Sequence, residues 1–179
     1  MQAYVFIAVS ADGFIARKNG DLDWLPGSDG SGPEDGEDYG YKEFFATIDT
    51  LVMGRHSFEK VLTFGEWPYK DKKVVVLSSK KDATPQHLKE YVQWLNCSPP
   101  ELVKKLSSQG DSHIYVDGGK TIQGFLYHVL INKIILTRVP VLIGDGIPLF
   151  GPLAGDIKLK HIKTQDYPSG FVQTHYKPV

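Results

Sequence analysis

The sequence has a single cysteine, Cys97, among its 179 residues. One thiol cannot form an internal disulfide or a CxxC pair, so a disulfide framework is excluded and a reducing compartment is favoured. An excess of either charge is also missing, because 20 Lys and Arg face 21 Asp and Glu. The resulting net charge of -1 provides no field to hold a polyanion, and we expect no nucleic-acid partner.

Long apolar runs and metal-binding spacings are missing as well. The N-terminal apolar run stops at Asp12 and has no basic segment before it, which argues against a signal peptide and a membrane span. The six histidines show no HExxH spacing, and no cysteine pair exists to complete a zinc site. The sequence therefore predicts a cytoplasmic protein without a bound metal and without a membrane partner.

Two common nucleotide-binding motifs are absent. The GDG at positions 144–146 is followed by IPLF rather than by a helix, so it is no dinucleotide fingerprint. The GKT at positions 119–121 would need a glycine five residues before Gly119 to form a P-loop, and that position holds Ile114. Any dinucleotide must bind without a Rossmann motif.

What is present is an alternation of strand and helix patterns. With 41% hydrophobic and 12% aromatic residues, the chain suits one domain over residues 1–179. Glycine- and acid-rich sequence from Asn19 to Gly40 predicts a long loop. The pattern predicts an α/β fold with an open mixed sheet flanked by helices and an antiparallel C-terminal hairpin. The predicted strands are Tyr4–Val9, Thr50–Met53, Lys73–Leu77, Ile114–Val116 and Lys133–Val141, the helices are Tyr39–Thr47, Arg55–Leu62, Ser98–Ser107 and Lys120–Val129, and the hairpin pairs Ile157–Thr164 with Phe171–Tyr176.

Two glycine-containing turns join a predicted strand to a predicted helix. The first is Gly54-Arg55-His56-Ser57 and the second is Gly118-Gly119-Lys120-Thr121. A helix N-terminus offers unpaired N–H groups and a partial positive charge to a phosphate, and a glycine there allows close approach of the backbone. Either turn on its own is equally compatible with an ordinary connection that carries a surface cation. Two such turns in one sheet suggest a ligand with two phosphates.

Other polar groups lie near predicted strand ends. Ser78 and Ser79 follow a strand and could hold a further phosphate. Asp12, Asp38 and Asp117 belong to a set of acids near strand ends and the long loop, where a proton donor would lie, although most loop acids are merely solvated. Composition does not choose among these acids.

In this order, the segments resemble the dihydrofolate reductase superfamily. The similarity is greater to one branch of it, the C-terminal reductase domain of the bifunctional riboflavin-pathway deaminase-reductase, and spans nearly the whole chain. The segments that carry it are SADGFIA at 10–16, VMGR at 52–55, VVLSS at 75–79, DGG at 117–119 with the following helix, and the stretch from Pro140 to Phe150.

The resemblance implies that NADPH lies across the strand ends. It implies that the turns Gly54–Ser57 and Gly118–Ile122 hold the phosphates of the cofactor. It also places Arg55, Ser78 and Ser79 near the adenosine 2′-phosphate, where charge-assisted hydrogen bonds favour NADPH over NADH. Ile15 and Gly20 would line the nicotinamide side.

The resemblance also suggests substrates, with Asp38 and Asp12 as the candidate catalytic acids. Asp38 falls where dihydrofolate reductases keep the acid that binds the pterin, whereas the start at Ser10 and Asp12 resembles the riboflavin branch. In that branch, hydride transfer converts the ribose of a phosphoribosylamino-pyrimidine to a ribityl chain. The zinc site of a deaminase is missing, so we expect a stand-alone reductase, commonly a homodimer in this branch. A dihydrofolate or pteridine reductase and a non-catalytic nucleotide-binding protein on the same fold remain as alternatives.

Overall fold

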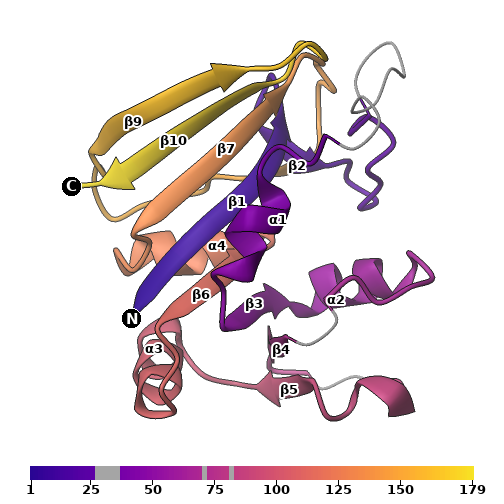
Figure 1. The fold of residues 1–179 in the computed structure, drawn as a ribbon, viewed down its shortest axis with the longest axis vertical. Helices are drawn as coiled ribbons and strands as arrows, with labels where there is room; N and C mark the ends of the chain where they lie inside the picture. The colour runs from indigo at the N-terminus through magenta and orange to yellow at the C-terminus, as the bar shows by residue number, and fades with distance from the viewer. Residues whose placement is uncertain (27–36, 70–71, 81–82) are drawn as a thin grey trace.

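An eight-stranded sheet runs through the molecule in the order β5-β4-β3-β6-β1-β7-β10-β9 (Figure 1). The computed structural model describes residues 1–26, 37–69, 72–80 and 83–179. The strands from β5 to β7 are parallel, β10 is antiparallel to β7, and β9 is antiparallel to β10. The strands of this sheet are β1 (Gln2–Ser10), β3 (Thr50–Gly54), β4 (Lys73–Leu77), β5 (Val92–Leu95), β6 (His113–Asp117), β7 (Lys133–Val139), β9 (Leu159–Asp166) and β10 (Val172–Pro178).

Helices cover both faces of the sheet. On one face, α1 (Tyr41–Ala46) and α2 (Arg55–Leu62) bury Phe44 and Phe58 against strand residues such as Leu51. On the other face, α3 (Pro99–Ser108) and α4 (Gly119–Tyr127) bury Leu102 and Phe125 against residues such as Val116. A short 3-10 helix, Gln86–Leu88, precedes β5. None of the described helices is long and apolar enough to cross a membrane.

The buried parallel strands end at one edge of the sheet. β1 lies between β6 and β7, and its residues Ala3, Val5 and Val9 are almost fully buried, as expected for a central strand. In a parallel sheet the carboxyl ends of the strands meet at the same edge, and ligands bind in the crevice outside that edge. Here that edge carries Gly54 at the end of β3 and Asp117 at the end of β6.

The predicted architecture is confirmed, with local differences. β5 was not predicted, because its sequence VQWL is short and carries a polar residue in the middle. A second sheet, in which β2 (Phe14–Ala16) pairs with β8 (Ile147–Pro148), was also missed, since two such short strands carry no periodicity. These two strands nevertheless place the chain after β1 beside the sequence that follows β7.

Several boundaries also differ from the prediction. Helix α1 begins at Tyr41 rather than Tyr39, because Tyr39 and Gly40 have positive φ angles of 55° and 78°, which a right-handed helix does not accept. Strand β7 ends at Val139, where the Val141 N–H turns back to the Val139 carbonyl at 2.8 Å. The predicted long loop lies partly outside the described residues.

Candidate active site

Two helix N-termini meet at the carboxyl edge of the sheet. β3 leads into α2 through Gly54, and the neighbouring strand β6 leads into α4 through Gly118. A Cβ atom on Gly54 would lie 3.1 Å from the Oγ1 of Thr121, and one on Gly118 would lie 2.3 Å from the Oγ of Ser57. The two predicted turns are thus in direct contact, and we call these four residues the glycine junction.

The glycine junction has the features of an anion site. Neither α2 nor α4 has a side chain that caps its N-terminus, and neither has an acidic residue in its first turn. Their first N–H groups and positive helix ends therefore face the junction without a capping carboxylate or hydroxyl. Arg55 and Lys120 add cations to the first turns of α2 and α4. These residues fit the adjacent phosphates of a dinucleotide.

Backbone also comes close to Ile15 at this edge. A Cβ atom on Gly119 would lie 3.1 Å from the Cδ1 of Ile15 and 3.1 Å from the carbonyl oxygen of Pro148. The β2–β8 sheet therefore lies against the first residue of α4. This contact brings Ile15, predicted for the nicotinamide side, next to the glycine junction.

The other residues predicted for the cofactor lie in more varied settings. Ile122 is only 1% exposed, and its side chain packs in the core. Its N–H donates to the Gly118 carbonyl at 2.9 Å within the helix. Ser78 donates its hydroxyl to the Lys80 carbonyl at 2.6 Å, while Ser79 is exposed. The N–H of Gly20 closes a turn on the Arg17 carbonyl. Their roles toward the cofactor stay predictions.

Asp117 is the acid that the tertiary structure singles out. It ends the central strand β6, and burial raises the pKa of its carboxyl to about 6. The Tyr115 hydroxyl lies 3.5 Å from its Oδ1 and donates to the Phe6 carbonyl at 2.8 Å. Burial, and secondly the nearby Asp117 charge, raise the pKa values of Tyr41 and Tyr69 as well.

The surroundings of Asp117 suit proton chemistry. A carboxyl group with a pKa near neutrality holds a proton for part of the time and can transfer it, which is the property of a general acid. Sequence patterns place Asp117 at a strand end together with other acids, but they contain no signal that its carboxyl group is withdrawn from water. Desolvation in the folded chain and the Tyr115 hydroxyl beside it distinguish Asp117 from the other acids.

The two acids predicted to be catalytic have other hydrogen-bond partners. Asp12 accepts from the Ser10 hydroxyl at 2.5 Å and from the N–H of Gly144 at 2.8 Å. These bonds, that of Ser10 first, lower its pKa, so Asp12 is ionised at neutral pH and fastens the turn after β1 to the loop after β7. Asp38 is exposed and accepts from the N–H groups of Gly40 and Lys42 at the start of α1. Their catalytic roles stay predictions.

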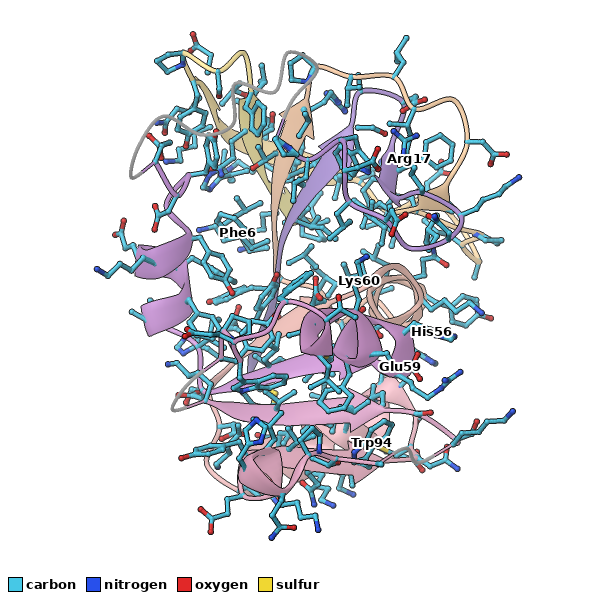
Figure 2. The ribbon with its side chains drawn as sticks, turned by 90° about the vertical axis from the view of Figure 1, so that its right-hand side faces the viewer. Phe6, Arg17, His56, Glu59, Lys60 and Trp94 are labelled. Carbon is cyan, nitrogen blue, oxygen red and sulfur yellow. The ribbon has the colours of Figure 1, made fainter. Side chains whose placement is uncertain are left out.

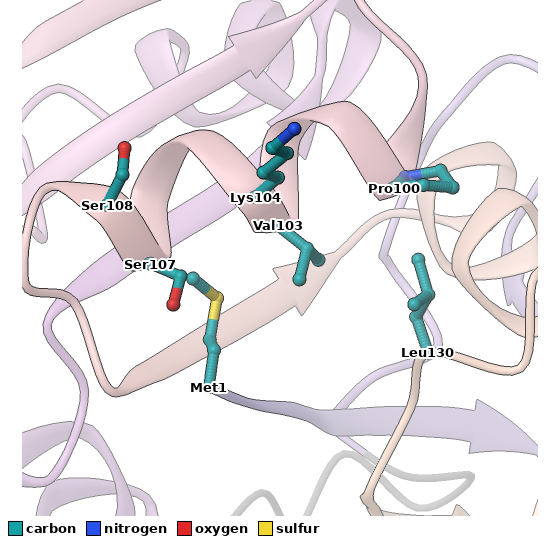
Figure 3. A pocket seen from close by; sticks show the side chains of 7 residues that line it. All are labelled: Met1, Pro100, Val103, Lys104, Ser107, Ser108 and Leu130. Atoms are coloured by element: carbon teal, nitrogen blue, oxygen red, sulfur yellow. The ribbon is translucent and has the colours of Figure 1, made fainter.

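Two hollows in the described surface lie away from this edge. One, of about 480 Å³, lies under α3 at the amino end of β1 and is lined by Met1, Val103, Lys104 and Leu130 among others (Figure 3). The other, of about 910 Å³, follows β4 and β5 near Thr50 and Lys73. Neither includes a residue of the glycine junction or a residue predicted to bind a cofactor. Among the described residues, no group of three or more His, Cys, Asp or Glu is placed to hold a metal ion.

Curated relatives cover almost the whole chain. The uncharacterized protein YwjB of Bacillus subtilis strain 168 is 35% identical over 175 residues, which is 96% of this chain and 95% of that protein. The uncharacterized protein YyaP of the same organism is 32% identical over 179 residues, covering 95% of this chain and 91% of that protein. The similarity therefore extends over more than nine-tenths of both chains in each comparison.

Solved structures share the fold. A putative riboflavin biosynthesis protein from Shewanella sp. PV-4 superposes with a TM-score of 0.92 and 38% identity, over 100% of this chain and 99% of that one. The diaminohydroxyphosphoribosylaminopyrimidine deaminase/5-amino-6-(5-phosphoribosylamino)uracil reductase of Thermotoga maritima gives 0.73 and 16% identity, a likeness of fold over 99% of this chain and 56% of that one. The sequence profile of the RibD C-terminal domain matches residues 3–173. With this match and the shared dihydrofolate-reductase-like fold, the chain belongs to the RibD C-terminal domain family.

Proposed function

We propose that this protein is an NADPH-dependent reductase that transfers hydride to a small pyrimidine- or pterin-type substrate. The proposed reaction is similar to that of 5-amino-6-(5-phosphoribosylamino)uracil reductase in riboflavin biosynthesis. Membership of the RibD C-terminal domain family supports a reductase-like function. The observation that carries the proposal is the glycine junction, where two helix N-termini without side-chain caps meet beside the partly buried acid Asp117.

Several groups of this chain would hold the cofactor. The first N–H groups of α2 and α4 would bind the two central phosphates, and Arg55 would bind the 2′-phosphate that distinguishes NADPH from NADH. Gly118 and Gly119 let backbone approach without a Cβ atom in the way. When bound, NADPH would supply the hydride.

The protein would contribute a proton and a fixed geometry. Reduction of a carbonyl or imine consumes a proton in addition to the hydride, and Asp117 has a pKa of about 6 that suits proton donation near neutral pH. Asp12 would keep the turn after β1 in place through its bonds to Ser10 and Gly144. Holding the reacting groups in position accounts for much of the rate in such reactions.

Titration calorimetry with NADPH and then NADH tests the cofactor assignment. We expect NADPH to bind more tightly, and the Arg55→Ala variant to lose most of the difference because it lacks the cation. Lys104→Ala removes a positive charge from α3, next to the hollow at the amino end of β1, and serves as the control. If neither nucleotide binds the wild type, the cofactor assignment is wrong.

Two alternatives give different results in turnover assays. A dihydrofolate or pteridine reductase would depend on Asp38, so unchanged turnover of dihydrofolate by Asp38→Asn argues against that substrate class. A non-catalytic nucleotide-binding protein would bind NADPH but reduce none of the pterins or pyrimidines offered. Loss of turnover in Asp117→Asn with retained NADPH binding supports the proposed reductase.

We also propose that the protein is a cytoplasmic homodimer. Apolar side chains are exposed in the segment after β7, among them Leu142 at 75% and Phe150 at 48% of their full surface. Exposed apolar surface of this kind favours association with a second copy. Light scattering of the purified protein at micromolar concentration gives the mass directly, and a monomer would contradict the proposal.

A further inference from the structure

The cation at the start of α2 is already neutralised by its own helix. Nη1 of Arg55 contacts Oε1 of Glu59 one turn later, and Nη2 lies 3.3 Å from Nε2 of His56. Nδ1 of His56 lies 3.0 Å from the other oxygen of Glu59. Figure 2 shows His56 and Glu59 together on α2, with Lys60 nearer the loop that carries Arg17. These three side chains, Arg55, His56 and Glu59, form a closed set that we call the α2 triad.

We propose that Glu59 sets the discrimination between NADPH and NADH by competing with the 2′-phosphate for Arg55. This inference rests on the proposed function and adds a specificity residue to it. The next cation of α2, Lys60, pairs with Asp21 of the loop after β2 at 3.2 Å. Glu59 is therefore the acid that faces Arg55, and its charge acts directly on any anion bound there.

The geometry favours competition between Glu59 and the phosphate for Arg55 over a role of Glu59 in supporting the phosphate site. Both terminal nitrogens of the Arg55 guanidinium already have a partner within the triad, so a phosphate that binds in a bidentate manner shares at least one of these nitrogens with Glu59 or His56. Arg55 and Glu59 are also partly exposed, with 30% and 35% of their side-chain surfaces accessible. Such an exposed pair within one helix is weak, so a phosphate dianion can displace it.

The size of the effect follows from Coulomb repulsion. A phosphate bound to the far side of Arg55 would lie roughly 7 Å from the Glu59 carboxylate. Repulsion between a dianion and a single charge across that distance in water corresponds to about a fivefold change in affinity at about 0.01 M ionic strength and about a twofold change at physiological salt. The nucleotide that lacks the 2′-phosphate should be almost unaffected.

The test compares two fragments that differ only in the 2′-phosphate, adenosine 2′,5′-bisphosphate and adenosine 5′-monophosphate. Glu59→Gln keeps the shape of the side chain and an oxygen that accepts from Arg55, but removes the charge. Glu90→Gln removes the same charge from an exposed position at the amino end of β5 and is the matched control. Calorimetry with each fragment, and with NADPH and NADH, gives the four affinities for each protein.

The expected result at about 0.01 M ionic strength is about fivefold tighter binding of adenosine 2′,5′-bisphosphate and NADPH by Glu59→Gln, with the two other ligands and the control unchanged. A change below twofold, or weaker binding of the bisphosphate, overturns the inference while the proposed function stands, because weaker binding means that Glu59 positions Arg55. If the wild type and Glu59→Gln bind neither NADPH nor the bisphosphate, the inference and the cofactor assignment both fall.

Discussion

Replacement of Gly118 by alanine tests the glycine junction most directly. Gly118 has φ 85° and ψ 139°, a conformation that residues with a Cβ atom rarely adopt, and this strain costs about 1–3 kcal/mol. The new Cβ would lie 2.3 Å from the Oγ of Ser57 but 3.5 Å from its Cβ, so rotation of the hydroxyl relieves the contact. The backbone strain therefore dominates the loss of stability, while the displaced hydroxyl enters the proposed phosphate site.

We expect Gly118→Ala to unfold in urea with a free energy about 1–3 kcal/mol below that of the wild type, and to bind NADPH at least about tenfold more weakly. Gly110→Ala is the control, because Gly110 has φ 95° but no heavy atom within 4 Å of the added Cβ. It should lose stability but keep NADPH affinity. The double variant Gly118→Ala/Ser57→Ala should regain part of the NADPH affinity but none of the stability that is lost to backbone strain. A Gly118→Ala protein with wild-type stability and NADPH affinity would refute the assigned geometry.

Three further predictions concern titratable groups. The folded pKa of Asp117, about 6, exceeds the ordinary 3.8, so the contribution of Asp117 to stability should fall by up to about 3 kcal/mol as pH rises between these values. The measure is the difference in unfolding free energy between the wild type and Asp117→Asn, and an equal difference at about pH 4.5 and 7.5 would contradict this. Desolvation lowers the pKa of His175 to about 4 from 6.5, so the contribution of this side chain to stability is fully present above pH 6.5 and falls by up to about 3 kcal/mol as pH drops toward 4. A His175→Gln variant with the same acid dependence as the wild type would refute this. Hydrogen bonds lower the pKa of Asp12, so Asp12→Asn should melt at a lower temperature than the wild type at pH 7, and this difference in melting temperature should vanish in acid. Equal melting temperatures at pH 7 would exclude the role of Asp12 in holding the loop.

Much of the sheet follows from local pattern. Buried strands such as β1 and β4 carry continuous apolar runs. Helix α3, predicted from Ser98, begins with a capping box in which Glu101 accepts from the Ser98 N–H at 2.8 Å. The hairpin of β9 and β10 was also predicted, since a glycine-containing turn separates two strand patterns. β5, β2 and β8 were missed, because a strand of two to four residues is defined by its neighbours rather than by its own sequence.

The candidate site also has features that the sequence predicts and features that only the tertiary structure decides. Sequence patterns alone determined that glycine turns lie at strand-to-helix joints, because a turn and a helix start leave local signals in residue type and spacing. Only the tertiary structure decided that Gly118 faces Ser57, that desolvation raises the pKa of Asp117, and that Glu59 pairs with Arg55. The physical reason is that burial, pKa and charge pairing depend on which distant segments pack together, and that packing is a property of the whole sheet.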